Sequence, residues 1–303
     1  MRVRIGTFNA ENLFARFRFR DQVLPIAPTQ PSWTSDETRY APFSEPRHRI
    51  TAEAMGAIRA DILGLQEIEN LPTLRLFLKQ FTLWMPAEGY PYPLVIDGND
   101  PRQIDVGIVS RFPLGAIRTH QFDRTPEGAH IFSRDCLEVE ICLPHGKTLT
   151  IFVNHFKSMA ENRDSTMAIR QTQAKRVVEI LQERFGPDPG EAAWVVLGDL
   201  NDYLPSKGLE PLLSQPWLEN VLNRLPSAER WTHYFAEHDT YNQLDYLLLS
   251  RSLAKANPTA LPEIERRGMP GRATKIKEAR FKGVGHRNPK ASDHCPLVIE
   301  IDI

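Results

Sequence analysis

Apolar and polar residues alternate along much of this 303-residue chain in patterns typical of an α/β protein. Residues 2–8 alternate, with Val3, Ile5 and Thr7 on one face, which predicts a β-strand. Similar patterns predict strands at 61–65, 94–96, 106–109, 134–141, 148–153, 194–197, 243–249 and 297–301. Apolar residues at helical spacing predict helices over 47–60, 71–81 and 165–185, and we expect residues 203–230 to mix loop and helix. In the helix 165–185 the expected apolar stripe is Ile169, Thr172, Val177, Ile180 and Leu181.

Polar residues gather where several of these strands end. The apolar run 194–197 leads through Gly198 directly into Asp199, Asn201 and Asp202. Such a cluster is also typical of an Asx-type turn, because Asp and Asn hydrogen-bond to nearby backbone. Polar residues of this kind stand, however, at six separate junctions: at strand ends they are Asn9/Glu11, Glu67, His155 and Asp199/Asn201, and at the start of a strand they are Asp245 and Asp293/His294. Because ligand and catalytic sites of α/β proteins lie at strand ends, the recurrence indicates a functional site.

The residue types in these clusters indicate a particular chemistry. Oxygen ligands without a Cys or His quartet are typical of a hard cation such as Mg²⁺ or Mn²⁺. Such an ion neutralises phosphate oxygens and stabilises displacement at phosphorus. The histidines His155 and His294 can divide proton transfer or transition-state stabilisation between them. Asp245 can hold one imidazole in the required tautomer. Spacing alone therefore predicts metal-dependent phosphoester chemistry.

Two segments lack apolar periodicity. Residues 15–48 combine an Arg-aromatic alternation at 16–20 with closely spaced prolines, so we expect a long irregular insertion. The alternation fits binding of single-stranded nucleic acid, and it fits an edge strand with a solvated cationic face equally well. Residues 262–290 are the most basic stretch of the chain, which predicts a loop that contacts a phosphate backbone or remains simply solvated.

Composition restricts the classes of protein that remain. The chain is 41% hydrophobic and 25% charged, which is ordinary for a globular protein, and its net charge of −1 requires any polyanion site to be local. Three cysteines argue against a disulfide framework. The N-terminal residues lack a signal-peptide pattern, and no apolar run approaches the roughly 18 residues of a membrane span. We therefore expect a cytoplasmic protein without a membrane span or a predicted protein partner, and a single domain over 1–303.

Seven short motifs along the chain resemble those of the endonuclease/exonuclease/phosphatase (DNase I-like) superfamily, in the same order. They are Thr7-Phe-Asn-Ala-Glu-Asn12, Leu65-Gln-Glu-Ile-Glu69, Ser110-Arg-Phe-Pro113, Asn154-His-Phe-Lys-Ser158, Gly198-Asp-Leu-Asn201, Gln243-Leu-Asp-Tyr246 and Ser292-Asp-His-Cys-Pro296. The form of the fourth motif is most similar to a bacterial nuclease-like branch. The matches extend over residues 5–299, nearly the whole chain.

The resemblance implies a four-layer sandwich in which two mostly antiparallel β-sheets pack face to face, with helices on the outer faces. It also implies residue roles, with Glu67 as the main ligand of Mg²⁺ or Mn²⁺, helped by Asn9, Glu11 and Asp293. His294 would be the general base, oriented by Asp245, and His155 would bind the scissile phosphate or protonate the leaving oxygen. Asp199 and Asn201 would position the nucleophile, the phosphate or a second metal, and Arg111 and Lys157 are further phosphate-binding candidates. Glu11 stands where abasic-site nucleases usually have Asp, and the 15–48 insertion is not common in the family.

The substrate remains open between two classes. The first is DNA or RNA, cleaved by a Mg²⁺- or Mn²⁺-dependent phosphodiesterase, and the two basic segments favour it. The alternative is a small-molecule or lipid phosphate hydrolysed by the same residues. A non-catalytic binding protein on the same fold is disfavoured, because Glu67, Asp199, Asp245, Asp293 and His294 are all present.

Overall fold

The first of two six-stranded sheets contains both ends of the chain. The computed structural model describes residues 1–19, 40–42, 46–87, 89–159 and 162–303. In spatial order, the strands of this sheet are β15 (Glu263–Ile264), β16 (Leu297–Asp302), β1 (Arg2–Leu13), β4 (Ile62–Ile68), β6 (Asp105–Ser110) and β5 (Tyr92–Val95). Strands β1 and β4 run parallel, and the other neighbouring pairs are antiparallel.

The second sheet repeats this arrangement. Its strands are, in spatial order, β11 (Leu218–Asn220), β14 (Asp245–Ser250), β10 (Trp194–Asp199), β9 (Thr148–His155), β8 (Cys136–Cys142) and β7 (Leu114–Arg118). Only β9 and β10 are parallel neighbours in it. Both sheets are therefore mostly antiparallel, as predicted.

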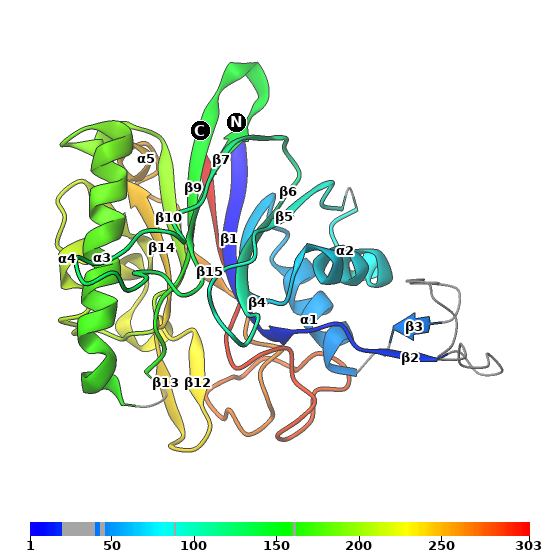
Figure 1. Cartoon of the computed structure of the whole chain (residues 1–303). Helices are drawn as coiled ribbons and strands as arrows, with labels where there is room; N and C mark the ends of the chain where they lie inside the picture. The colour runs from blue at the N-terminus through cyan, green and yellow to red at the C-terminus, as the bar shows by residue number, and fades with distance from the viewer. Residues whose placement is uncertain (20–39, 43–45, 88, 160–161) are drawn as a thin grey trace, which may run out of the picture.

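The two sheets pack face to face around a shared apolar layer. Strand alternation explains the layers, because Val195 and Leu197 of β10 point into the shared core and Trp194 and Val196 point outward. Helices α1 (Pro46–Ala57) and α2 (Leu71–Gln80) cover the outer face of the first sheet, and α3 (Arg163–Phe185) and α4 (Glu210–Leu213) cover that of the second (Figure 1). This arrangement confirms the predicted four-layer sandwich.

Helix α3 differs from its predicted apolar stripe. Its start follows from the sequence, because the Asn162 side chain accepts the Asp164 backbone N–H at 2.8 Å. Ile169, however, is 44% exposed, and the buried face includes Arg170 and Gln173 instead. Arg170 is buried because its guanidinium lies 3.2 Å from the Asp202 carboxylate and donates to backbone carbonyls. A specific ion pair thus overrides the hydrophobic pattern.

Short elements account for most other differences from the sequence prediction. The pattern did not indicate β7 and β11, the hairpin of β12 (His233–Phe235) and β13 (Thr240–Asn242), or helix α5 (Arg251–Ala256). Within 15–48, β2 (Phe17–Phe19) pairs antiparallel with β3 (Tyr40–Pro42), so this segment is not wholly irregular. Residues 20–39 and 43–45, including Arg20, lie outside the described residues. Residues 262–290 are irregular after β15, as expected.

The hairpin β12–β13 and the chain ends lie at opposite ends of the sheets. Arg2 pairs with Asp302 at one end, whereas β12–β13 and the 262–290 loop lie at the other (Figure 1). No helix among the described residues is long and apolar enough to cross a membrane.

Candidate active site

Four strands bring their polar residues to the same end of the space between the sheets. Strand alternation continues the inward-facing pattern of Ile5, Val153, Leu197 and Leu247 to the side chains of Asn9, His155, Asp199 and Asp245. Asp199 is directly opposite both His155 on β9 and Asp245 on β14. The predicted residues of three separate motifs are therefore neighbours in one sheet, and Asn9 reaches them from the other.

Glu67 is placed by an unusual backbone conformation. Its φ is +63°, and the register of β4 against β6 shifts between Gln66 and Ile68. Positive φ is uncommon for residues other than glycine, and it also occurs here at Glu11, Asn12 and Asn201. The conformation lets the Glu67 Oε2 atom accept the Asn12 backbone N–H at 2.9 Å. Backbone strain concentrated in this way is typical of functional sites.

The Asn9 amide connects the two sheets at this end. Its Nδ2 atom lies 3.1 Å from Asp199 Oδ2 and 3.4 Å from Glu67 Oε1. Its Oδ1 atom accepts the Glu11 backbone N–H at 3.0 Å. Two carboxylates from different sheets thus converge on one buried amide nitrogen, and the ligand roles of Asn9 and Glu67 stay predictions.

His294 and Asp245 form the predicted histidine-aspartate pair. The His294 Nδ1 atom lies 2.9 Å from Asp245 Oδ2, and its Nε2 atom lies 3.6 Å from Asp199 Oδ2. Burial by itself lowers the pKa of His294, but the carboxylates of Asp245 and Asp199 together raise it well above its ordinary value. The Thr232 hydroxyl accepts the Asp245 backbone N–H at 3.0 Å and so fixes the position of Asp245.

His155 has the opposite electrostatic character. Its Nε2 atom lies 3.6 Å from Asp199 Oδ2 and 4.0 Å from Glu67 Oε1. Burial lowers the pKa of His155 well below its ordinary value, and the charges of Arg134 and His294 lower it further. The surroundings therefore favour the neutral form of His155 and the protonated form of His294.

Asp199 and Asn201 form the turn that the sequence suggested and belong to the site as well. The Asn201 backbone N–H donates to Asp199 Oδ1 at 2.9 Å, which is the Asx-type hydrogen bond. Burial raises the pKa of Asp199 to about 7; the Asp245 charge also raises it, and that of His294 lowers it. The Asn201 amide donates to both Asp199 and the Phe156 carbonyl.

Glu11 and Asp293 meet at Lys290, a residue of the basic loop. The Lys290 ammonium lies 2.6 Å from Glu11 Oε2 and 4.0 Å from Asp293 Oδ2. Burial and Asp293 raise the pKa of Glu11, while Lys290 opposes them. Burial also resists ionisation of Asp293, but Lys290 and His294 hold its pKa below its ordinary value. In this geometry Glu11 is ion-paired, and its role as a metal ligand stays a prediction.

Three cations and two other side chains at the site were missed by the sequence reasoning. Arg134 is buried with its Nε atom 3.0 Å from Asp100 Oδ2, and it donates to the Phe156 carbonyl at 3.1 Å. Arg102 also binds Asp100 and raises the positive charge near Glu67. The full missed set is Asp100, Arg102, Arg134, His233 and Lys290. None of them belongs to one of the seven motifs, and only Lys290, which lies in the basic segment 262–290, had a signal in the sequence.

The two predicted phosphate-binding residues differ in position. Arg111 pairs with Asp61 at 2.5 Å, at the opposite end of β4 from Glu67, so the structure does not bring it to the site. This prediction is wrong because the Ser-Arg-Phe-Pro motif begins where β6 ends, beside the start of antiparallel β4. Lys157 lies two residues beyond His155, and its backbone N–H donates to Gln173 of α3 at 2.9 Å. Its role in binding phosphate stays a prediction.

The donor atoms of this site fit a hard divalent cation. The side chains supply carboxylate and amide oxygens, which are the ligands that Mg²⁺ and Mn²⁺ prefer. Among the described residues, Glu67 Oε1 has contacts of 3.4 Å with the Asn9 amide and 4.0 Å with His155 Nε2, lengths at which a hydrogen bond is weak or absent. The buried Asp245 Oδ1 atom has no hydrogen-bond partner among the described residues. Ligand atoms of Asp199, Asp245 and His294 also lie within 4.8 Å of one another.

Comparisons with known proteins identify the family and the fold. The sequence profile of the "Endonuclease/Exonuclease/phosphatase family" matches residues 6–294. A comparison with curated protein sequences finds no significant match. Among solved structures, zebrafish (D. rerio) TDP2, humanized by 14 mutations, has a TM-score of 0.62 at 15% identity, covering 100% of this chain and 99% of that one.

Two further structures show the same fold. The human Nocturnin catalytic domain with a bound sulfate anion has a TM-score of 0.62 at 16% identity, covering 99% of this chain and 94% of that one. An endonuclease/exonuclease/phosphatase family protein from Bacteroides thetaiotaomicron has a TM-score of 0.61 at 16% identity, covering 100% and 99%. Since the family profile spans nearly the whole sequence, the chain belongs to the endonuclease/exonuclease/phosphatase family, whose members are generally divalent-metal-dependent phosphoric ester hydrolases.

Proposed function

We propose that this protein is a Mg²⁺- or Mn²⁺-dependent phosphodiesterase that hydrolyses nucleic acid, with His294 as the general base. The observation that carries the proposal is the pair of contacts made by one imidazole. Its Nδ1 atom is held by Asp245 at 2.9 Å, and its Nε2 atom faces Asp199 at 3.6 Å. Asp199 in turn shares the Asn9 amide with Glu67. The proposed base His294, the carboxylate of Asp199 that would position the nucleophile, and the predicted metal ligand Glu67 are therefore linked through successive contacts.

The residues divide the reaction among them. Glu67, Asn9 and Asp293 would hold the cation, which supplies charge neutralisation at the phosphate when bound. Asp199 and Asn201 orient the attacking water, and His294 accepts its proton. As a base His294 must be neutral, so the proposal requires that positive charge near Asp199 and Asp293 lowers its raised pKa.

His155 is better suited to binding the phosphate than to donating a proton. Burial keeps it neutral, and its Nε2 atom lies between the carboxylates of Asp199 and Glu67. A neutral imidazole still donates one hydrogen bond to a phosphate oxygen. The buried guanidinium of Arg134 and the exposed one of Arg102 add positive charge on this side.

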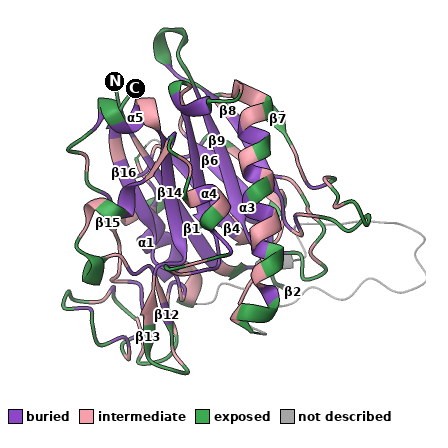
Figure 2. Cartoon of the chain, turned by 90° about the vertical axis from the view of Figure 1, so that its left-hand side faces the viewer, coloured by how far each residue is buried: buried purple, intermediate pink, exposed green. Residues whose placement is uncertain are grey.

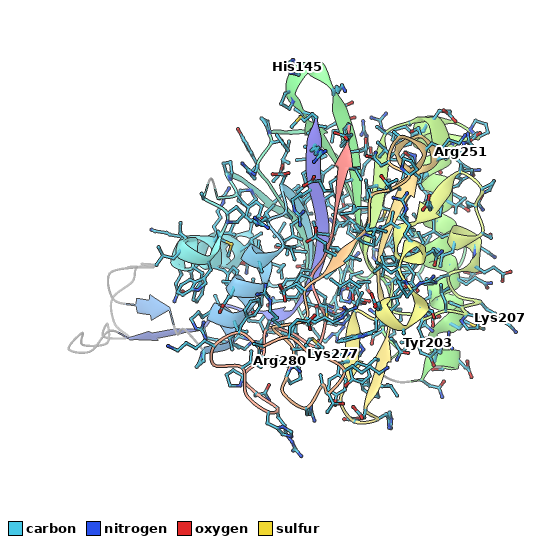
Figure 3. All side chains as sticks on the ribbon, turned by 180° about the vertical axis from the view of Figure 1, so that it is seen from behind. His145, Tyr203, Lys207, Arg251, Lys277 and Arg280 are labelled. Atoms are coloured by element: carbon cyan, nitrogen blue, oxygen red, sulfur yellow. The ribbon has the colours of Figure 1, made fainter. Side chains whose placement is uncertain are left out.

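The cationic loop beside the site supports nucleic acid as the substrate. Lys277 and Arg280 lie at the same end of the molecule as β12–β13, and His145 lies at the other end (Figure 3). Arg280 donates to the Met269 and Ala273 carbonyls and so has a structural role. The exposed residues Lys275, Lys277, Lys282 and Arg287 face solvent and fit a phosphate backbone. A related fold, that of D. rerio TDP2, has been solved "complexed with single strand DNA product".

The test measures cleavage of single- and double-stranded DNA, RNA and bis-p-nitrophenyl phosphate with Mg²⁺ and with Mn²⁺. We expect His294→Asn to reduce all activities by about 100-fold or more. The matched control is His145→Asn, since His145 is exposed at the opposite end and Asn tolerates its φ of +62°.

Three outcomes distinguish the proposed substrate from its alternatives. Metal-dependent cleavage of nucleic acid that His294→Asn abolishes supports the proposal. Cleavage of the small ester alone favours the alternative of a small-molecule or lipid phosphate. If none of these substrates is hydrolysed although calorimetry shows that Mg²⁺ binds, the proposal is contradicted.

A further inference from the structure

Strand β1 departs from regular pairing beside Glu67. Its register against β4 shifts between Asn9 and Leu13. Within this bulge the φ values of Glu11 and Asn12 are +51° and +58°. Most of β1 is buried (Figure 2), whereas Asn12 is exposed, and the Asn12 backbone N–H donates to Glu67 Oε2 at 2.9 Å. The geometry of the bulge therefore determines where Glu67 is held.

Arg47 contacts the carbonyl groups of this bulge. Residues in a bulge leave the regular ladder, so their backbone polar groups need other partners. The Arg47 Nη2 atom donates to the Glu11 carbonyl and lies 3.5 Å from the Asn12 carbonyl. Because Arg47 belongs to the first turn of α1, its guanidinium connects this helix to both residues of the bulge that have positive φ.

Helix α1 is a fixed support for this guanidinium. The Thr51 hydroxyl, one turn after Arg47, donates to the Ala291 carbonyl at 2.8 Å. The Ser292 hydroxyl donates in turn to the Asn9 carbonyl at 2.8 Å. Thr51 and Ser292 are at most 2% exposed, so water does not replace these bonds if the helix shifts. Arg47 therefore approaches the bulge from a position that buried hydrogen bonds define.

We propose that Arg47 is a positioning residue for the divalent cation, because it holds the Glu11–Asn12 bulge whose backbone N–H orients Glu67. This inference rests on the proposed function, in which Glu67 is a ligand of the cation. Groups that hydrogen-bond to a metal ligand fix its orientation, and their loss typically weakens metal binding by about 10- to 100-fold. Arg47 acts one step further out, through the backbone of Asn12, so we expect an effect at the lower end of this range.

The charge of Arg47 by itself would have the opposite effect on the cation. A guanidinium near the ligands repels a divalent cation, so on electrostatic grounds alone its removal would strengthen metal binding. This charge does reach the site, because burial and Asp293 raise the pKa of Glu11 and the charge of Arg47 acts against them. The sign of the change in affinity therefore separates positioning from charge.

The test is the dissociation constant of Mg²⁺, measured by calorimetry on the whole chain after removal of metal with EDTA. We expect Arg47→Met to weaken Mg²⁺ binding by about tenfold. Arg47→Lys keeps the charge and a donor, so it should weaken binding less, and it decides the test if Arg47→Met does not fold. Glu67→Gln assigns the measured ion to this site, because it should weaken binding more than either Arg47 variant.

Arg49→Met is the matched control. Arg49 lies on the same helix, and it also donates to a backbone carbonyl of another segment, that of Lys282, and to Glu53 at 2.9 Å. Urea denaturation in EDTA should show a loss of stability in both variants, because each loses the hydrogen bonds of one guanidinium. Only Arg47→Met should change the affinity for Mg²⁺, since a purely structural role would lower the stability and leave the affinity of the folded protein as it was.

Weaker Mg²⁺ binding in Arg47→Met with unchanged binding in Arg49→Met supports the inference. Unchanged or tighter binding in Arg47→Met overturns it and leaves the proposed function intact. An equal loss of affinity in both variants also overturns it, because the helix as a whole would then be responsible. If the wild type binds no Mg²⁺, or if Glu67→Gln leaves the binding unchanged, the inference fails together with the metal-binding part of the proposed function.

Discussion

The Asn9 amide lies between two carboxylates, so the change Asn9→Asp tests the electrostatics of the site directly. The substitution keeps the size of the side chain and replaces a hydrogen-bond donor by a third negative charge. The new oxygen would occupy the position of Nδ2, 3.1 Å from Asp199 Oδ2 and 3.4 Å from Glu67 Oε1. Asn9 and Asp199 are both at most 1% exposed, so solvent screens this repulsion poorly.

The structure sets the size of the effect. At an effective dielectric constant of about 20, the repulsion from the Glu67 carboxylate alone amounts to about 5 kcal/mol, and the ionised fraction of Asp199, whose pKa is about 7, adds to it. The protein avoids part of this by binding a proton at the new carboxyl group. Keeping the new carboxyl group protonated at pH 7 requires its pKa to rise from about 3.9 to at least 7, which costs about 4 kcal/mol. This cost is smaller than the electrostatic repulsion of the ionised form, so it determines the loss of stability. We therefore expect metal-free Asn9→Asp to unfold with about 4 kcal/mol less free energy than the wild type.

The deficit depends on pH with a definite sign. The pKa of the new group is raised by folding, so the folded state of the variant binds the proton more tightly than the unfolded state does. The deficit is present at pH 7, shrinks as the pH falls, and disappears near pH 4, where the group is protonated in both states. Added Mg²⁺ should also reduce the deficit, because a third carboxylate is a further oxygen ligand.

Urea denaturation in EDTA at pH 7 and pH 5, and again with Mg²⁺, measures these effects. Asn12→Asp is the matched control, because the same substitution three residues later falls on an exposed side chain, and we expect a change below about 1 kcal/mol. Equal stability of Asn9→Asp and wild type in EDTA would refute the reasoning. A deficit that persists unchanged at pH 5 would refute its electrostatic origin.

Three further predictions concern the support of the site. Arg170→Met should reduce the free energy of unfolding by about 3 kcal/mol, because Arg170 and Asp202 form an ion pair at 3.2 Å in which both side chains are at most 2% exposed. Burial raises the pKa of Asp105 to about 6, so folding disfavours its charge; Asp105→Asn should be more stable than wild type by about 1–3 kcal/mol at pH 7.5 and equally stable near pH 4. Gly64→Ala should cost about 2 kcal/mol, because its methyl carbon would lie 2.2 Å from Leu197 Cδ1 between the sheets.

Chemical denaturation checks all three, and each has its own contrary outcome. A loss below 1 kcal/mol in Arg170→Met would mean that Arg163, Ser206 and the Tyr203 backbone N–H satisfy Asp202 without Arg170. A pH-independent difference for Asp105→Asn would exclude its charge as the cause. If adding Leu197→Ala to Gly64→Ala recovers none of the lost stability, steric overlap between the sheets is not the reason.

The sequence by itself determined the secondary structure of the sandwich and most of the polar residues at its site. Strand alternation and helical spacing are local properties, and they predicted the strands that form the centre of both sheets and the helices α1, α2 and α3. The same local pattern identified Asn9, Glu67, His155, Asp199, Asp245 and His294, because polar residues of this kind recur at the junctions between apolar strands and loops. The order of the motifs then indicated the family.

Only the tertiary structure decided which of these residues meet. Asn9 and Asp199 are 190 positions apart and touch because two sheets pack face to face. Arg111 belongs to a motif as clear as the others, yet the antiparallel pairing of β4 and β6 places it at the wrong end. Arg134 and His233 carry no pattern of their own, and they reach the site through a buried ion pair and a single backbone bridge. Pairing between distant strands depends on packing and not on local sequence. It therefore decides which residues meet at the site, and the periodicity of the sequence does not show this.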